Sequence, residues 1–165
     1  MIILQVKLLK MQKDINEEHE IFYVTQDVIL FNERNELLAL RHFTGKWLLA
    51  GGHMNKGEGW QNALDREIQE ETGIVGAEIG EIFSVDSWKS FEGANYGVFF
   101  LGKTKSDKIE LSDEHTEFKW LKSLQEVEEL DWWCAPLRER IVSAWKKVNA
   151  GGVVCKKFEN FKVII

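Results

Sequence analysis

The stretch that decides the fold is Gly52–Ile74, which reads GHMNKGEGWQNALDREIQEETGI. Its second half has apolar side chains at intervals of four residues, which places them on one face of a helix: Trp60, Leu64 and Ile68. Gly73 follows at the position where a left-handed residue commonly ends a helix. The stretch therefore predicts a helix over about residues 60–71.

Three glutamates share one side of this predicted helix. At about 100° per residue, the side chains of Glu67, Glu70 and Glu71 project within one arc of roughly 100°. Carboxylates that close repel one another unless a cation lies between them. Hard divalent cations prefer oxygen ligands, and Mg²⁺ in particular links carboxylates to substrate phosphates. The cluster therefore indicates a divalent metal site.

The residues around the cluster support a built site. We expect Arg66 to pair with Glu58 and so to fix the helix against the preceding loop. Gly51, Gly52 and Gly57 allow the backbone to approach a ligand closely, and the Gly51 carbonyl is a further candidate metal ligand. The usual explanation of a glutamate run is a solvated helix face. Here the glycine-rich turn, the apolar stripe and the arginine favour a site.

The stretch resembles the Nudix box, written GX5EX7REUXEEXGU with U aliphatic. Every fixed position is filled, by Gly52, Glu58, Arg66, Glu67, Ile68, Glu70, Glu71, Gly73 and Ile74. The order of the flanking strands, the segment 113–121 and the terminal helix are also similar to small members of this MutT-like hydrolase family. Ala50 is a departure, since many relatives place a proline before the glycine pair.

The resemblance implies an α+β fold, an α/β/α sandwich around a mixed β-sheet, over a single domain spanning 1–165. It also implies a hydrolase dependent on Mg²⁺ or Mn²⁺ that cleaves the phosphoanhydride of a nucleotide by in-line attack of water. Glu70 and Glu71 would be the main metal ligands, and Glu67 a further ligand or the general base. Arg66 and Glu58 would orient the cluster.

The general base stays open between the box and a later loop. Glu114 and Glu117 are the later candidates, as bases or as further metal ligands, and Glu92 is a weaker third. Each is also explained as a solvated loop or strand-edge acid.

The resemblance implies a small nucleotide as substrate, and the base of a nucleotide needs a stacking surface. The aromatic candidates near loops or element ends are Trp88, Phe91, Tyr96, Trp132 and Trp133, each with core packing as the alternative. His53 and His115 are candidates for contact with phosphate, each with a structural hydrogen bond as the alternative. The sequence motifs that resemble those of NADH-cleaving and ADP-ribose-cleaving relatives are absent, which favours a nucleoside triphosphate-type substrate.

Composition sets limits on the partners. The chain has 165 residues, with 27 acidic and 21 basic side chains and a net charge of -6. Without a basic stripe, general nucleic-acid binding is not expected. No apolar run approaches the ~20 residues that span a bilayer. The apolar run at the start of the chain is also shorter than the hydrophobic region of a signal peptide. The two cysteines, Cys134 and Cys155, show no metal spacing. We expect a soluble cytoplasmic protein.

Outside the box, the β-branched and aromatic run 21–31 predicts a strand, followed by strands at 36–43, 77–86, 95–101 and 117–121. Ser123 with Glu126 predicts a capping box on a short helix, and Pro136 the start of a last helix. The segment 153–165 is a candidate extra strand. The aromatic-rich C-terminal third of the chain is compatible with a homodimer.

Two other classes of function remain open at this point. One is a non-catalytic Nudix-fold module that binds a nucleotide, although such a module would be expected to have lost box glutamates. The other is an isomerase on the same fold, which needs a cysteine and a glutamate in one pocket. Cys134 and Cys155 lie far from the box in sequence and do not favour it.

Overall fold

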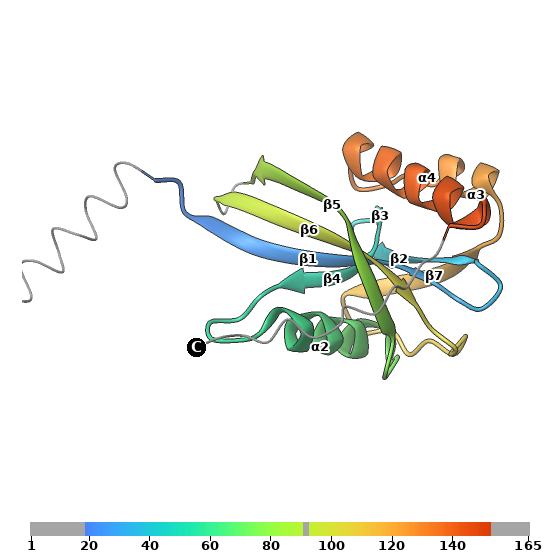
Figure 1. The fold of residues 1–165 in the computed structure, drawn as a ribbon, viewed down its shortest axis with the longest axis horizontal. Helices are drawn as coiled ribbons and strands as arrows, with labels where there is room; N and C mark the ends of the chain where they lie inside the picture. The colour runs from blue at the N-terminus through green and yellow to red at the C-terminus, as the bar shows by residue number, and fades with distance from the viewer. Residues whose placement is uncertain (1–18, 91–92, 153–165) are drawn as a thin grey trace, which may run out of the picture.

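A seven-stranded mixed sheet lies between helices in the computed structural model, which describes residues 19–90 and 93–152 (Figure 1). The central strand is β1 (Phe22–Phe31). It pairs in parallel along its whole length with β6 (Ala94–Lys103), and β6 pairs antiparallel with β5 (Glu78–Lys89). The prediction of strands in these three segments is confirmed, with longer second and third strands than the sequence indicated.

The other edge of β1 is divided between two strands. Its middle residues, 25–28, pair antiparallel with β4 (Ala50–His53), and its last residue pairs with β2 (Leu37–His42). β2 in turn pairs with β3 (Trp47–Leu48) and with β7 (His115–Leu121). The sequence indicated only a glycine pair where β4 lies, because two adjacent glycines are rare inside strands.

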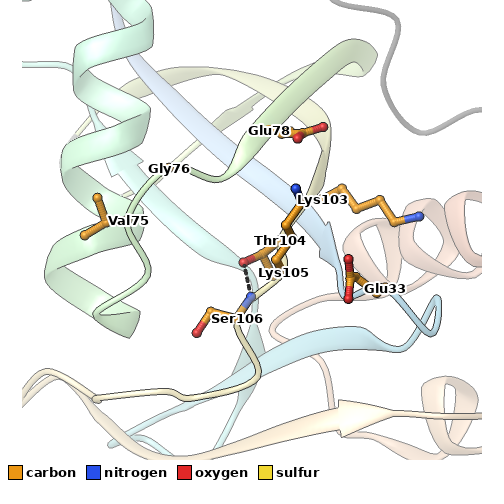
Figure 2. Close-up of a pocket in the computed structure, with 8 residues that line it drawn as sticks. All are labelled: Glu33, Val75, Gly76, Glu78, Lys103, Thr104, Lys105 and Ser106. Carbon is orange, nitrogen blue, oxygen red and sulfur yellow. Dashed lines mark hydrogen bonds between the residues drawn. The ribbon is translucent and has the colours of Figure 1, made fainter.

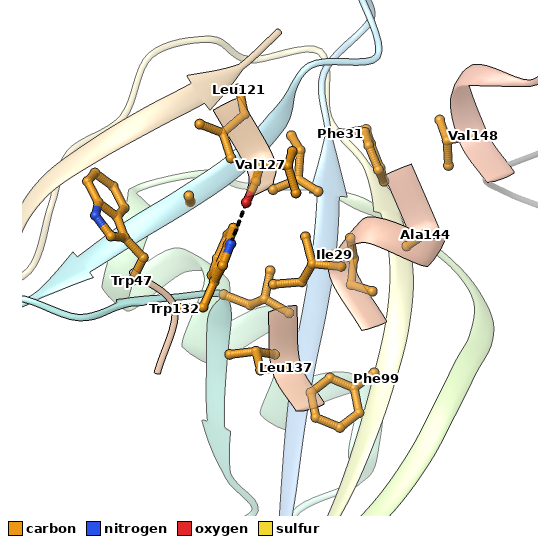
Figure 3. Packing of buried hydrophobic residues seen from close by; sticks show 14 of the residues in the cluster. Ile29, Phe31, Trp47, Phe99, Leu121, Val127, Trp132, Leu137, Ala144 and Val148 are labelled. Carbon is orange, nitrogen blue, oxygen red and sulfur yellow. Dashed lines mark hydrogen bonds between the residues drawn. The ribbon is translucent and has the colours of Figure 1, made fainter. Parts of the chain in front are cut away.

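Helices cover both faces of the sheet (Figure 1). α2 (Trp60–Thr72) lies on one face, and α3 (Leu124–Glu129) and α4 (Ala135–Asn149) lie on the other. Each face of the sheet has its own hydrophobic core, and alternate residues of β1 lie in one or the other. This follows because successive side chains of a strand point to opposite faces. Val28 and Leu30 pack with α2, whereas Ile29 and Phe31 pack with α3 and α4 (Figure 3). The predicted α/β/α sandwich with a mixed sheet is confirmed.

The box helix begins and ends where the sequence indicated. Gly73 adopts φ 70° and donates its N–H to the Gln69 carbonyl, which closes the last turn. At the other end the Trp60 ring stacks on Phe100 of β6, with centroids 5.1 Å apart and planes within 1°. The Trp60 ring therefore fixes the first turn of the helix on the sheet, and Gly73 ends the helix.

The capping box predicted before α3 is half correct. Ser123 accepts a hydrogen bond from the backbone N–H of Glu126, as a cap does. The Glu126 carboxylate, however, accepts from the N–H of Lys122 rather than from that of Ser123. Pro136 lies in the first turn of α4 as expected. The candidate strand at 153–165 lies outside the described residues. Among the helices that are described, none is long and apolar enough to cross a membrane.

Candidate active site

The glycine pair of β4 holds the box helix against the central strand. The Gly51 N–H donates a 2.8 Å hydrogen bond to Oε2 of Glu71, near the end of α2. Gly51 has φ 150°, and a Cβ at this position would stand 2.1 Å from the backbone oxygen of Gln26 in β1. No other residue type fits this conformation and this approach without strain, so glycine is required here for β4 to lie on β1.

Gly52 is in close contact with a side chain rather than with the backbone. A Cβ on Gly52 would stand 2.7 Å from the carboxyl carbon of Glu67, so the Glu67 carboxylate lies directly on the backbone of β4. The sequence suggested that these glycines allow close approach of a ligand. The structure shows that they allow close approach of the chain's own strand and carboxylate. Gly57 differs from both, because it has φ 81° with open space around it.

Arg66 donates hydrogen bonds to three carboxylates of the box. Its Nε and Nη2 donate to the two oxygens of Glu58 at 3.0 and 3.1 Å, and its Nη1 donates to Glu67 at 2.8 Å and to Glu70 at 3.0 Å. The hydrogen bonds from Arg66 hold the pKa of Glu58 below its usual range. The predicted contact between Arg66 and Glu58 is therefore present. Glu70 is the most exposed of the three carboxylates that Arg66 contacts.

A cavity of about 620 Å³ opens beside the glycine pair, on the α4 face of the sheet. β1, β4 and Glu71 line one side, and the first turns of α4 line the other. Trp88, Phe99 and Trp133 contribute aromatic surface. This volume lies within the range of small-molecule sites, about 300–1,000 Å³.

Four acidic side chains line the cavity, and three of them, Asp27, Glu71 and Glu114, have no arginine or lysine partner among the described residues, whereas the fourth, Asp86, pairs with Arg140. Burial raises the pKa of Glu71 to about 8, and the negative charges of Glu67, Asp27 and Glu114 add to this effect, while the Gly51 N–H opposes it. Burial also raises the pKa of Asp27 to about 7, against the nearby positive charge of Arg140. These carboxyl groups therefore lie close enough to repel one another.

The sequence did not point to Asp27. The available signal was an acidic residue in the otherwise apolar and aromatic run 21–31, at a position that alternation places next to buried residues. Arg140 was also missed, because one arginine on an amphipathic helix carries no pattern. Its Nη2 donates to Asp86 at 2.8 Å, and its guanidinium lies 3.9 Å from the centre of the Phe99 ring. Among the residues that line this cavity it is the only arginine or lysine.

The structure separates the candidates for the general base. Glu114 lines the cavity, whereas Glu117 lies on β7 and pairs with Arg41 at 3.2 Å, outside the cavity. The difference follows from register, because Glu117 is opposite Arg41 in the β2–β7 pair. Glu92 lies outside the described residues. Which carboxylate acts as the base stays a prediction.

The aromatic candidates also separate. Trp88 and Trp133 line the cavity, and Trp88 lies over Gly97, where a Cβ would stand 2.5 Å from the indole. Trp132 is instead a core residue whose Nε1 donates to the Val127 carbonyl (Figure 3). Tyr96 packs its edge against Phe22 and does not line the cavity. Phe91 lies outside the described residues.

The two histidine candidates both line the cavity. His53 approaches the Asn95 side chain, with its Nε2 at 3.4 Å from Oδ1, so it has a structural partner. The His115 side chain is 1% exposed, and its Nε2 lies 3.8 Å from Oε1 of Glu71. Burial lowers the pKa of His115, which favours the neutral ring.

The donor set of the site suits a hard divalent cation, although no metal-binding group is preassembled. Within residues 19–90 and 93–152, no three His, Cys, Asp or Glu side chains are arranged to hold a metal ion. Arg66 occupies Glu67 and Glu70, and the Gly51 N–H occupies Glu71. Burial, together with the negative charges of Glu67, Asp27 and Glu114, raises the pKa of Glu71, and a cation relieves this repulsion between carboxylates. Carboxylate oxygens are also the ligands that Mg²⁺ and Mn²⁺ prefer.

A second cavity, of about 670 Å³, lies at the other end of the β5–β6 pair (Figure 2). Its charged side chains are Glu33, Glu78, Lys103 and Lys105, and the Thr104 hydroxyl accepts from the N–H of Ser106. None of the box residues lines it. The first cavity is therefore the one connected with the box.

Comparison with known proteins identifies the family. The sequence profile of the NUDIX domain matches residues 22–141. The chain belongs to the Nudix family. The match confirms the resemblance drawn from Gly52–Ile74, and the chain is a Nudix hydrolase, an enzyme that acts on a phosphoanhydride bond.

Solved structures of Nudix proteins share the fold. The MutT protein from Methanosarcina mazei Go1 is 28% identical, with a TM-score of 0.66 over 79% of this chain and 96% of that chain. A C. elegans Ap4A hydrolase is 21% identical, with a TM-score of 0.67 over 78% and 98%. The NUDIX domain of Shewanella oneidensis NrtR, in complex with ADP ribose, is 18% identical, with a TM-score of 0.66 over 80% and 92%.

Substitution of the two glycines should separate catalysis from folding. Gly52→Ala places a methyl group against the Glu67 carboxylate, so we expect a folded protein with at least about a 10-fold loss of hydrolytic activity. Gly51→Ala places it against the backbone of β1, so we expect a lower midpoint of thermal unfolding. Circular dichroism melting and an activity assay check both. Full activity of Gly52→Ala would contradict the placement of Glu67.

The stability of the metal-free protein should fall as pH rises from about 4 to 8. The ordinary pKa values of Glu71 and Asp27 are near 4, and the folded state raises them to about 8 and 7. Between these values the unfolded state has lost protons that the folded state keeps, so deprotonation favours unfolding, by at most about 1.4 kcal/mol per pH unit for each group.

Urea unfolding in a chelator at several pH values measures this dependence. Glu71→Gln should weaken it, and Glu139→Gln, which changes an exposed carboxylate of α4, should leave it as in the wild type. An equal slope in the wild type and in Glu71→Gln would contradict the assignment to Glu71.

Proposed function

We propose that the protein is a divalent-metal-dependent pyrophosphohydrolase that cleaves a nucleoside triphosphate or another nucleoside diphosphate-linked small molecule. The observation that carries the proposal is the convergence of Asp27, Glu71 and Glu114 with the aromatic side chains of Trp88 and Trp133 in one cavity. Carboxylates at one part and flat apolar surface at another suit a ligand with a phosphate chain and a base.

Mg²⁺ or Mn²⁺ would be held by Glu67, Glu70 and Glu71, with the Gly51 carbonyl as a further ligand, as the Nudix resemblance implies. When bound, the ion supplies positive charge that activates water and offsets the charge of the phosphate oxygens. Glu114 is the better supported of the two later candidates for an additional ligand, because it lines the cavity and Glu117 does not.

The chain's own residues supply positioning and proton transfer. Arg66 fixes Glu67 and Glu70 relative to the loop before α2, so the carboxylates keep one geometry. Glu67 or Glu114 accepts the proton of the attacking water. Arg140, held by Asp86 and the Phe99 ring, provides a fixed positive charge beside the carboxylates. Together these side chains orient a phosphoanhydride for in-line attack.

The substrate class follows from the cavity and from the similar proteins. The exposed Trp88 and Trp133 side chains offer stacking surface of the kind that binds a base. Two of the similar structures are named for Ap4A hydrolysis and for a complex with ADP ribose, and a third is a MutT protein. The first two names involve a nucleotide compound, which supports a nucleotide substrate here. The expectation of a cytoplasmic enzyme remains part of this proposal.

A panel of nucleoside triphosphates, dinucleoside polyphosphates and nucleotide sugars, assayed with Mg²⁺ and Mn²⁺ for released phosphate or pyrophosphate, tests the proposal. We expect turnover of at least one compound, no turnover in excess chelator, and a loss of several orders of magnitude in Glu70→Gln and Glu71→Gln. Glu117→Gln is the matched control and should keep its rate, because its carboxylate lies outside the cavity.

Full activity of the Glu70→Gln and Glu71→Gln variants would contradict the metal assignment. Saturable nucleotide binding without any product in the wild type would replace the hydrolase by a binding module.

A further inference from the structure

Gln26, in the middle of β1, carries a buried amide without a partner. The residue is 2% exposed, and neither its Nε2 nor its Oε1 has a hydrogen-bond partner among the described residues. Leaving a buried polar group unpaired costs about 1–3 kcal/mol. An apolar side chain of the same size would avoid this cost. Such a group therefore indicates an ordered water or a functional role.

The register places Gln26 next to the box. Gln26 is opposite Gly52 of β4, and Val28, the next residue on the same face of β1, packs in the core that includes α2. The Gln26 side chain therefore faces α2. A Cβ on Gly52 would stand 2.8 and 3.0 Å from the two oxygens of Glu67, so the Glu67 carboxylate lies on the same face.

The two groups are within reach of one shared water. Cβ positions of directly opposite residues in an antiparallel pair are about 4.5–5.5 Å apart, and the glutamine amide extends beyond its Cβ. The structure shows no direct hydrogen bond between Gln26 and Glu67. Arg66 holds Oε1 of Glu67, whereas Oε2 has no hydrogen bond from the residues that the structure describes. A buried water needs two to four polar partners, and these atoms provide them.

We propose that Gln26 is a positioning residue that holds one ordered water between its side-chain amide and Oε2 of Glu67. The role of Glu67 in the reaction rests on the proposed function, whereas the water does not. Arg66 fixes one oxygen of the carboxylate and the water fixes the other, so the plane of the carboxylate is set on both sides. Without the water, the described residues hold only Oε1 of the carboxylate, through Arg66.

The first measurement uses the wild-type protein alone. We expect magnetisation transfer, in an NMR experiment on the metal-free protein, between a long-lived water and the side-chain N–H₂ of Gln26. The absence of such a water would overturn the proposal.

Two variants then test its effect. Gln26→Met removes both polar atoms of the side chain at similar volume. Ser84→Ala is the control, because the Ser84 hydroxyl is also buried and has no hydrogen-bond partner among the described residues. Ser84 lies on the other face of the sheet, since it is opposite Phe99, which packs on the α4 face. In Gln26→Met we expect the ¹³C signal of the Glu67 carboxyl carbon to move and kcat to fall about 10- to 100-fold at constant KM. Neither variant should lower the midpoint of thermal unfolding, and Ser84→Ala should leave the Glu67 signal and kcat unchanged.

An unmoved Glu67 signal in folded Gln26→Met would overturn the proposal. So would a lower unfolding midpoint together with an unmoved Glu67 signal, because Gln26 would then be a structural residue. If the wild type hydrolyses no nucleotide, the proposed function fails on its own, and the water and the Glu67 signal still decide the role of Gln26.

Discussion

The close approach of β4 to β1 is the constraint on which the site depends. It brings the Gly51 N–H to Oε2 of Glu71 and lets the Glu67 carboxylate lie on the Gly52 backbone. A Cβ at either position would collide, with the backbone of β1 at Gly51 and with the carboxylate at Gly52. The glycine pair therefore sets the distance between the helix and the sheet, and through it the place of two carboxylates.

Both faces of the central strand β1 contribute side chains to the site. Gln26 faces α2 and Glu67, while Asp27 faces the cavity, Phe99 and Arg140. One strand can do this because its neighbours differ along its length, with β4 beside its middle and β2 beside its end. The apolar residues that follow, Val28 to Phe31, anchor the strand in two cores, so its polar positions are held rigidly.

The box was predictable from the sequence because its signals are local. The helical spacing, the helix end at Gly73 and the pairing of Arg66 with Glu58 involve residues within eight positions of one another. Asp27, Arg140 and Gln26 were not predictable, since their meaning depends on strand register and on a helix more than a hundred residues away in the chain. The same reason explains Glu114 and Glu117, which look alike in sequence and differ only through the pairing of Glu117 with Arg41.

The structure shows where part of the excess of acidic residues lies. Asp27, Glu67, Glu71 and Glu114 are four of the 27 acidic residues of the chain, and they gather where burial and neighbouring negative charge raise the pKa of Glu71. A divalent cation would reverse the sign of the charge there, which makes a phosphate substrate compatible with an acidic protein.

Titration of Mn²⁺ followed by electron paramagnetic resonance, on the wild type and on Glu71→Gln, tests this claim most directly. The account predicts saturable binding to the wild type that is strongly weakened in the variant. Equal affinity of the two proteins for Mn²⁺, or no binding to either, would contradict it.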